Sequence, residues 1–503
     1  MNNKIKTLGE LKNSGYKPKS IKDEIRDNLV SRLRKNQPSF DGILGYEETV
    51  IPDVERALLS RHNILFLGLR GQAKTRMARQ MTELLDEYIP VVAGSEINDD
   101  PLKPVSRYAR DLIKEKGDAT PIEWIHKSQR YGEKLATPDV SVADLVGDID
   151  PIKAANLRLN FGDEMVIHYG IIPRSNRCIF VINEIPDLQA RIQVALFNIL
   201  EEGDVQIRGF KLRIPLDILF VFTANPEDYT NRGSIVTPLK DRIQSQILTH
   251  YPKSIDVALS ITEQEAFIHD HQRSRVRISD LVKRLIEQIS FEARSSEYVD
   301  KKSGVSARLS ISALENAYSA AERRAIINNE NETQVWINDL VGIIPSITGK
   351  IELVYEGEQE GPFQVAMNLV EKAIRSQFVT YFPNPDALKK KRTTTAQQPV
   401  ENPYRSVISW FDKGNSLNLF FNIRDEERMR ELYKVDGLHA LVKKYFKGAN
   451  DREAALLMEF VLHGLSAYSL ISKKVVEGKV EFKDLMGSML NLGSTSYEEE
   501  ETN

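Results

Sequence analysis

Short, uninterrupted apolar runs alternate with longer helical patterns in the first half of the chain. The runs at 63–67, 178–182 and 218–223 lack polar alternation, which is typical of strands in a sheet that is covered on both faces. Apolar positions recur at helical spacing elsewhere, for example over 21–35 and 188–200. Strands that alternate with helices predict a parallel α/β sheet.

The second half of the chain is dominated by helical spacing. It predicts helices at 281–293, 310–326 and 362–378, and more helices between 403 and 490. The polar stretch 381–402, which contains a run of lysines and threonines, predicts a linker between these two helical regions. In the first half, a hairpin is expected at about 152–169, around the turn Phe-Gly-Asp-Glu.

Composition and charge exclude several classes of protein. The length of 503 residues suggests about three domains. With 68 Lys+Arg against 72 Asp+Glu, stable binding to nucleic acid is not expected. The single cysteine, Cys178, excludes a disulfide-stapled fold and thiolate-rich metal sites. No apolar run approaches the length of a membrane span and the first residues are polar, so we expect a cytoplasmic protein.

A glycine-rich loop follows the first predicted strand. It fits G-x-x-x-x-G-K-[ST] except that Ala73 replaces the second glycine. Backbone N–H groups of such a loop and the following helix N-terminus bind phosphate oxygens. Lys74 would reach the β- and γ-phosphates and Thr75 would ligate Mg²⁺, which predicts ATP and Mg²⁺ as cofactors. The loop comprises Gly68, Leu69, Arg70, Gly71, Gln72, Ala73, Lys74 and Thr75.

An alternative interpretation accompanies this loop. It could be a glycine turn before an ordinary helix, without any ligand. The methyl group of Ala73 adds a cost of roughly 1 kcal/mol or more if the backbone must be left-handed at this position.

The second predicted strand ends in Asn183 and Glu184. An apolar strand with two polar residues at its end has the Walker B form, in which the first residue is normally an aspartate that holds the water shell of magnesium. Asn183 can donate or accept hydrogen bonds there and would hold Mg²⁺ through water, but it brings no charge. Glu184 is predicted to polarise the attacking water. The alternative is a buried strand with a polar end.

Three further residues follow in the order of a nucleotide-hydrolysing site. Asn225 ends the third predicted strand, where its amide would orient water beside the γ-phosphate, the sensor 1 role. Arg242 could act in trans as an arginine finger, and Arg308 could contact the phosphates as sensor 2. Each is weak evidence alone, and their order after the two preceding motifs gives them weight.

These motifs together resemble the AAA+ ATPases, and more narrowly the branch of the magnesium-chelatase ATPase subunit and the MoxR-type ATPases. Close matches are Ala-Asp-Leu-Val-Gly-Asp-Ile-Asp-Pro at 143–151 and Tyr-Gly-Ile-Ile-Pro-Arg-Ser-Asn-Arg at 169–177. The resemblance covers about 40–375. It implies a hexameric ring with nucleotide sites between subunits, a helical lid, and β-hairpins at 152–169 and 204–214.

The resemblance also implies a function. Such ATPases typically remodel a partner that bears a von Willebrand factor A domain with a metal-dependent adhesion site. The segment 403–490 lacks the Asp-x-Ser-x-Ser pattern of that site, so the domain would belong to another chain. We therefore expect an ATP-hydrolysing ring motor that acts on a protein partner. The alternatives are a weakly hydrolysing, nucleotide-gated scaffold and the ATPase subunit of a true metal chelatase.

The expected fold is α/β, a P-loop AAA+ parallel-sheet core with a helical lid domain and an additional C-terminal helical domain. The expected segments are an N-terminal extension at 1–40, the core at 41–251, the lid at 252–380, the linker at 381–402, the C-terminal helical domain at 403–490 and an acidic tail at 491–503.

Overall fold

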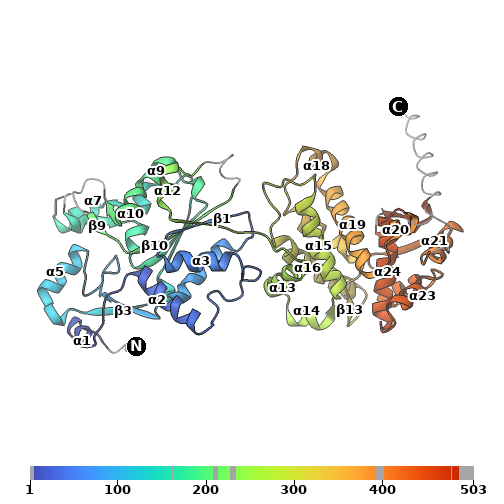
Figure 1. Cartoon of the computed structure of the whole chain (residues 1–503), viewed down its shortest axis with the longest axis horizontal. Helices are drawn as coiled ribbons and strands as arrows, with labels where there is room; N and C mark the ends of the chain where they lie inside the picture. Colours follow the sequence, from blue (N-terminus) through green and yellow to red (C-terminus); the bar gives the residue numbers. More distant parts are fainter. Residues whose placement is uncertain are drawn as a thin grey trace. The chain divides into compact units, whose positions relative to one another are not determined.

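Figure 1 shows the chain as a computed structural model, which divides into two compact units, Met1–Tyr251 and Pro252–Asn503. The structure describes residues 5–160, 163–207, 213–226, 234–390, 402–476 and 478–485. Residues 391–401 of the expected linker and the whole of the acidic tail lie outside this part, and the first half of that linker contains a short helix, α20 (Pro385–Lys390). None of the helices in it has the length and apolar character that crossing a membrane requires.

A five-stranded parallel sheet forms the centre of unit 1. The three strands that the sequence predicts are confirmed as β1, β7 and β10. The two outer strands were not predicted, because the residues of β4 (Tyr-Gly-Glu-Lys-Leu) are largely polar and β11 is short. The strand order is β11 (Ser245–Leu248), β1 (Ile64–Leu67), β10 (Ile218–Ala224), β7 (Cys178–Asn183) and β4 (Tyr131–Leu135).

Helices cover both faces of this sheet, as the apolar strands require (Figure 1). Ile64 and Phe66 belong to one hydrophobic cluster, whereas Leu65 between them belongs to the cluster on the opposite face. The helix expected at 188–200 is divided in two near Leu196. The first face is covered by α2 (Ile21–Arg34), α3 (Val50–Leu59) and α4 (Lys74–Gln80), and the second by α9 (Ala190–Ala195), α10 (Phe197–Glu202) and α12 (Thr237–Arg242).

Helix α2, from the expected N-terminal extension, packs into unit 1. Ile21, Ile25 and Leu29 of α2 are buried in the first cluster. On the same helix, the Glu24 carboxylate accepts hydrogen bonds from both terminal nitrogens of Arg130, at 2.6 and 2.8 Å, and both side chains are buried. A bidentate ion pair of this kind is strong and geometrically specific. It fixes α2 beside the start of β4.

The prediction of a hairpin at 152–169 is wrong for the first half of this segment. Residues there form α7 (Pro151–Leu157), because the Asp150 side chain caps the helix by accepting from two backbone N–H groups and Pro151 suits the first turn. The strand β6 (Ile167–Tyr169) pairs instead with β5 (Gly147–Ile149), in antiparallel orientation. Residues 161–162 of the expected turn lie outside the described part.

The second hairpin, expected at 204–214, is confirmed. β8 (Asp204–Gln206) and β9 (Arg213–Pro215) pair in antiparallel orientation. Residues 208–212 between them lie outside the part of the chain that the structure describes.

Unit 2 is built around long helices that share one hydrophobic cluster. The helices predicted in its first half are confirmed as α15 (Asp280–Ser295), α16 (Arg308–Ile327) and α19 (Pro362–Tyr381). The segment expected as a separate C-terminal domain packs into the same cluster through α24 (Asp451–Ala467), which is buried along most of its length. A methyl group at Gly464 would overlap Phe378, so the close approach of α24 to α19 requires glycine.

The C-terminal part of unit 2 is not wholly helical. It contains a three-stranded antiparallel sheet in the order β14 (Leu417–Phe420), β16 (Lys479–Lys483) and β15 (Ser472–Val476). The expected α/β fold is therefore confirmed as a five-stranded parallel-sheet core accompanied by helical regions, which is consistent with a P-loop AAA+ fold.

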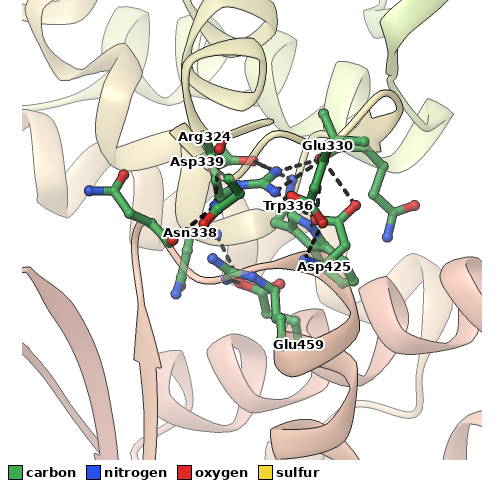
Figure 2. A network of polar contacts seen from close by, with 12 residues as sticks. Arg324, Glu330, Trp336, Asn338, Asp339, Asp425 and Glu459 are labelled. Carbon is green, nitrogen blue, oxygen red and sulfur yellow. Dashed lines mark hydrogen bonds and ion pairs between the residues drawn. The ribbon is translucent and has the colours of Figure 1, made fainter. Parts of the chain in front are cut away.

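A buried network of polar side chains joins α16 to the C-terminal part of unit 2 (Figure 2). Arg324, which is 1% exposed, donates to Asp425 Oδ1 at 2.6 Å and to Asp339 Oδ2 at 3.1 Å. Asp425 begins α22 (Asp425–Tyr433) and also accepts from Trp336 Nε1 at 2.8 Å and Thr333 Oγ1 at 3.0 Å. Each charge is therefore paired and hydrogen-bonded.

A second buried ion pair extends this network toward α24. Arg428 and Glu459 are both fully buried and lie 3.2 Å apart. Burial raises the pKa of Glu459 to about 7, although the charge of Arg428 opposes this shift. This pair joins α22 to α24 (Asp451–Ala467) within unit 2.

Candidate active site

The glycine-rich loop connects β1 to α4 at the edge of the sheet where all the parallel strands end. Open α/β sheets bind their ligands at this edge. The Gly68 N–H donates to the Ala224 carbonyl of neighbouring β10 at 3.2 Å, and a methyl group at Gly68 would overlap Thr249 Oγ1. Gln72 Oε1 accepts from the same Thr249 hydroxyl at 2.6 Å. Neighbouring strands therefore fix both ends of the loop.

Two tyrosine hydroxyls hold the outside of the loop. Tyr46 donates to the Gln72 carbonyl at 3.1 Å, and Tyr251 donates to the Arg70 carbonyl at 2.9 Å. Burial raises the pKa of Tyr46 to about 12, so it remains a hydroxyl donor at neutral pH. Sequence reasoning missed Tyr46, Thr249 and Tyr251, because no motif connects them to a loop so distant in the chain.

Ala73 has a left-handed backbone, with φ 56° and ψ 14°. Because a Cβ atom crowds the following carbonyl in this conformation, the residue carries a strain of about 1–2 kcal/mol that glycine avoids. The substitution that the sequence shows at the second glycine position therefore stores strain directly before Lys74.

Replacing Ala73 with glycine is expected to stabilise unit 1 by about 0.5–1 kcal/mol, because the relieved strain exceeds the added entropy of the unfolded chain. The matched control is Ala155→Gly on the exposed face of α7, which is expected to cost about 1 kcal/mol. Thermal denaturation of the full chain measures both. The strain argument is wrong if both variants melt below the wild type.

The structure brings Lys74 and Asn225 together. The Lys74 ammonium group donates to the Gly68 carbonyl, to the Leu69 carbonyl at 2.9 Å and to Asn225 Oδ1 at 2.7 Å. Asn225 directly follows β10, the strand next to β1 in the sheet. The cation of the loop and the amide at the strand tip therefore face the same small space.

Asn183 and Thr75 meet on the other side of the loop. Asn183 Oδ1 accepts from Thr223 Oγ1 at 3.1 Å and lies 3.4 Å from Thr75 Oγ1. Thr223 Oγ1 also accepts from the Glu184 backbone N–H at 3.1 Å. Glu184 has a left-handed backbone at φ 56°, so the chain turns sharply where the strand ends.

The roles predicted for Arg242 and Arg308 stay predictions, because Arg242 would act on a neighbouring subunit and Arg308 belongs to unit 2. Arg242 at the end of α12 pairs with Glu201 at 2.6 Å and lies over the Phe197 ring. Arg308 begins α16 in unit 2, where its side chain is exposed. Within one chain, the structure therefore assembles the loop, Asn183, Glu184 and Asn225, and leaves Arg242 paired with another helix.

The assembled residues fit a magnesium–triphosphate ligand. Lys74 supplies a positive charge, and the Thr75 hydroxyl and Asn183 oxygen supply the neutral oxygens. Among the described residues, no group of three or more histidine, cysteine or carboxylate side chains forms a metal site. Mg²⁺ at nucleotide sites needs few protein ligands, because water and phosphate oxygens complete its octahedron.

No family model matches this sequence, and no curated protein matches it either. The chain is similar to a solved structure described as a candidate ATPase from Cytophaga hutchinsonii, with 18% identity, a TM-score of 0.29, and coverage of 72% of this chain and 98% of that chain. A cryo-EM-based model of magnesium chelatase subunits BchI and BchD gives 17% identity, a TM-score of 0.30, and coverage of 59% and 90%.

A third similar structure is Hsp104 with ATPγS and casein, at 13% identity and a TM-score of 0.35, covering 61% of this chain and 49% of that chain. Because each TM-score lies below 0.5, the fold assignment depends on the strand order and loop of this chain itself.

Proposed function

We propose that this chain binds ATP with Mg²⁺ and hydrolyses it at the edge of the unit 1 sheet. The observation that carries the proposal is the convergence of Lys74, Thr75, Asn183 and Asn225, contributed by the loop and by two neighbouring strands. A phosphate-binding loop alone could be a structural turn. A cation, two amides and a hydroxyl gathered at its mouth favour a ligand site over that reading.

Each residue has a role that follows from its chemistry. Lys74, which contacts carbonyl groups and Asn225 in the structure, would transfer its hydrogen bonds to phosphate oxygens. Asn225 would then orient a water molecule, and Glu184 would accept its proton. Mg²⁺, when bound, would neutralise charge on the phosphates near Thr75 and Asn183.

The finer proposal is an AAA+ ring motor of the magnesium-chelatase or MoxR type that remodels a protein partner. It is supported by the order of the motifs and by the hairpin β8–β9 before Asn225. In a ring, Arg242 would serve the site of a neighbouring subunit, and Arg308 would approach the phosphates from unit 2 acting as the lid. The partner proposed is a protein with a von Willebrand factor A domain.

A nucleotide-gated scaffold remains the second candidate, because Asn183 brings no negative charge to a position that is normally an aspartate. A true metal-chelatase subunit is the third, and the same ring and partner chemistry would serve it. Hydrolysis rates separate the scaffold from the motor.

Steady-state phosphate release by the full chain tests the proposed hydrolysis. Lys74→Ala is expected to reduce phosphate release at least about 100-fold, because the positive charge that would contact the transferring phosphoryl group is lost. The control is Lys116→Ala on exposed α5 (Arg107–Lys116), which should hydrolyse ATP at the wild-type rate. Equal rates for the wild type and Lys74→Ala would contradict the proposed hydrolytic site.

A further inference from the structure

Glu133 lies beside the candidate magnesium side of the site. It belongs to β4, the edge strand that pairs with β7, and its Oε1 atom accepts from Asn183 Nδ2 at 2.6 Å. Its Oε2 atom accepts from Arg79 at 2.9 Å and from the Tyr131 hydroxyl at 3.1 Å. Both carboxylate oxygens are therefore held, which fixes the direction of the group.

This contact determines which way the Asn183 amide faces. An ionised carboxylate can only accept hydrogen bonds, so the NH₂ group of Asn183 must point toward Glu133. The amide oxygen then points to the opposite side, where the hydroxyls of Thr75 and Thr223 lie at 3.4 and 3.1 Å. The reversed amide would place two oxygens together at Glu133, and its NH₂ group instead of its oxygen would face Thr75.

Asn183 lacks the negative charge of an aspartate, but the Glu133 carboxylate in direct contact with its amide carries one. Charge-assisted hydrogen bonds are roughly twice as strong as neutral ones, and they polarise the amide that they contact. Arg79 offsets part of the charge, but its side chain is 64% exposed, so solvent screens that ion pair. The Glu133 side chain is 24% exposed and Asn183 is 9% exposed, so their own contact is better shielded.

We propose that Glu133 is a positioning residue for magnesium: it holds the Asn183 oxygen toward Thr75 and supplies, across the amide, the charge that an aspartate would carry there. This inference rests on the proposed ATP site. It explains how a site with asparagine at this position can still bind a hydrated divalent cation. Partners in the shell behind the ligands typically change metal affinity by about 10–100-fold when they are substituted.

An exchange of the two side chains tests this inference. Glu133→Gln removes the charge and permits either orientation of Asn183. Asn183→Asp alone places two carboxylates in contact, where they repel each other. The double variant Asn183→Asp/Glu133→Gln restores one charge and one hydrogen bond with the donor and acceptor exchanged. Arg79→Met is the control, since it breaks the outer ion pair and keeps the contact between Glu133 and Asn183.

The readout is a ratio for a fluorescent ATP analogue binding to the full chain: its dissociation constant in EDTA divided by its dissociation constant in Mg²⁺. Glu133→Gln and Asn183→Asp are each expected to lower this ratio about tenfold or more. The double variant and Arg79→Met should retain a ratio close to that of the wild type. Equal affinities in EDTA for all variants would show that each retains a folded loop.

Two results would overturn the inference while leaving the proposed function intact. One is an unchanged ratio in Glu133→Gln, and the other is a double variant that remains as impaired as the single ones. The inference would also be overturned if Arg79→Met lowered the ratio as much as Glu133→Gln, because the whole cluster would then have a structural role. A wild type that binds no nucleotide overturns the proposed function and this inference together.

Discussion

Glu184→Gln is expected to slow ATP hydrolysis by the full chain by a factor of about 10²–10⁴, the usual contribution of a general base, while ATP binding persists. Glutamine has nearly the shape of glutamate but cannot accept a proton from water at neutral pH. The backbone N–H of Glu184 is bonded to Thr223, and its position directly after β7 places the residue beside Asn183.

Glu202→Gln provides the matched control for this prediction. Glu202 is an exposed glutamate at the end of α10, and its substitution should leave hydrolysis unchanged. If Glu184→Gln hydrolyses ATP as fast as the wild type, the motor is excluded and the nucleotide-gated scaffold becomes the better account. If the rate falls as expected, the variant holds ATP long enough to capture a protein partner, and recovery of one with a von Willebrand factor A domain supports the finer proposal.

Asp425→Ala is expected to destabilise unit 2 by about 3–5 kcal/mol, the usual cost of breaking a buried ion pair by removing one of its members. Asp425 is 3% exposed and accepts hydrogen bonds from Arg324, Thr333 and Trp336, all of them buried (Figure 2). Alanine would leave the Trp336 indole N–H without its acceptor, and Asp339 would remain as the only carboxylate paired with Arg324 among the described contacts.

Tryptophan fluorescence during chemical denaturation measures this loss. Of the three tryptophans, Trp336 and Trp410 belong to unit 2, so a Trp124→Phe background reports unit 2 alone. The control is Glu332→Ala, which removes exposed ion pairs with Arg277 and Arg452 and should cost less than about 1 kcal/mol. An Asp425→Ala variant no less stable than Glu332→Ala would show that the buried network does not hold the C-terminal part of unit 2.

The sequence predicts the central fold well because strong local signals produce it. The apolar runs of β1, β7 and β10 have no polar alternation, and α15, α16 and α19 have long apolar periodicity. The region 152–169 was misinterpreted because a turn-like tetrapeptide outweighed a stronger signal, the capping pair Asp150 and Pro151. Helix capping is local and could have been recognised from the sequence.

Other features depend on contacts between distant residues. Glu133 lies on a strand whose side chains are mostly polar because it forms the sheet edge, so neither a motif nor periodicity indicates its contact with Asn183. The same applies to Arg324 and Asp425, which are separated by 101 positions. The joining of the C-terminal segment to the helices before it follows from such pairs and from Gly464, none of which has a local signature.

Equilibrium binding of ATP, measured by titration calorimetry on the full chain with Mg²⁺ present, tests the central claim most directly. The wild type should bind ATP, and Lys74→Ala should bind it at least about tenfold more weakly, because the charge-assisted hydrogen bonds of the ammonium group are lost. Absence of binding by the wild type, or equal affinity in the two proteins, would contradict an ATP site at this loop.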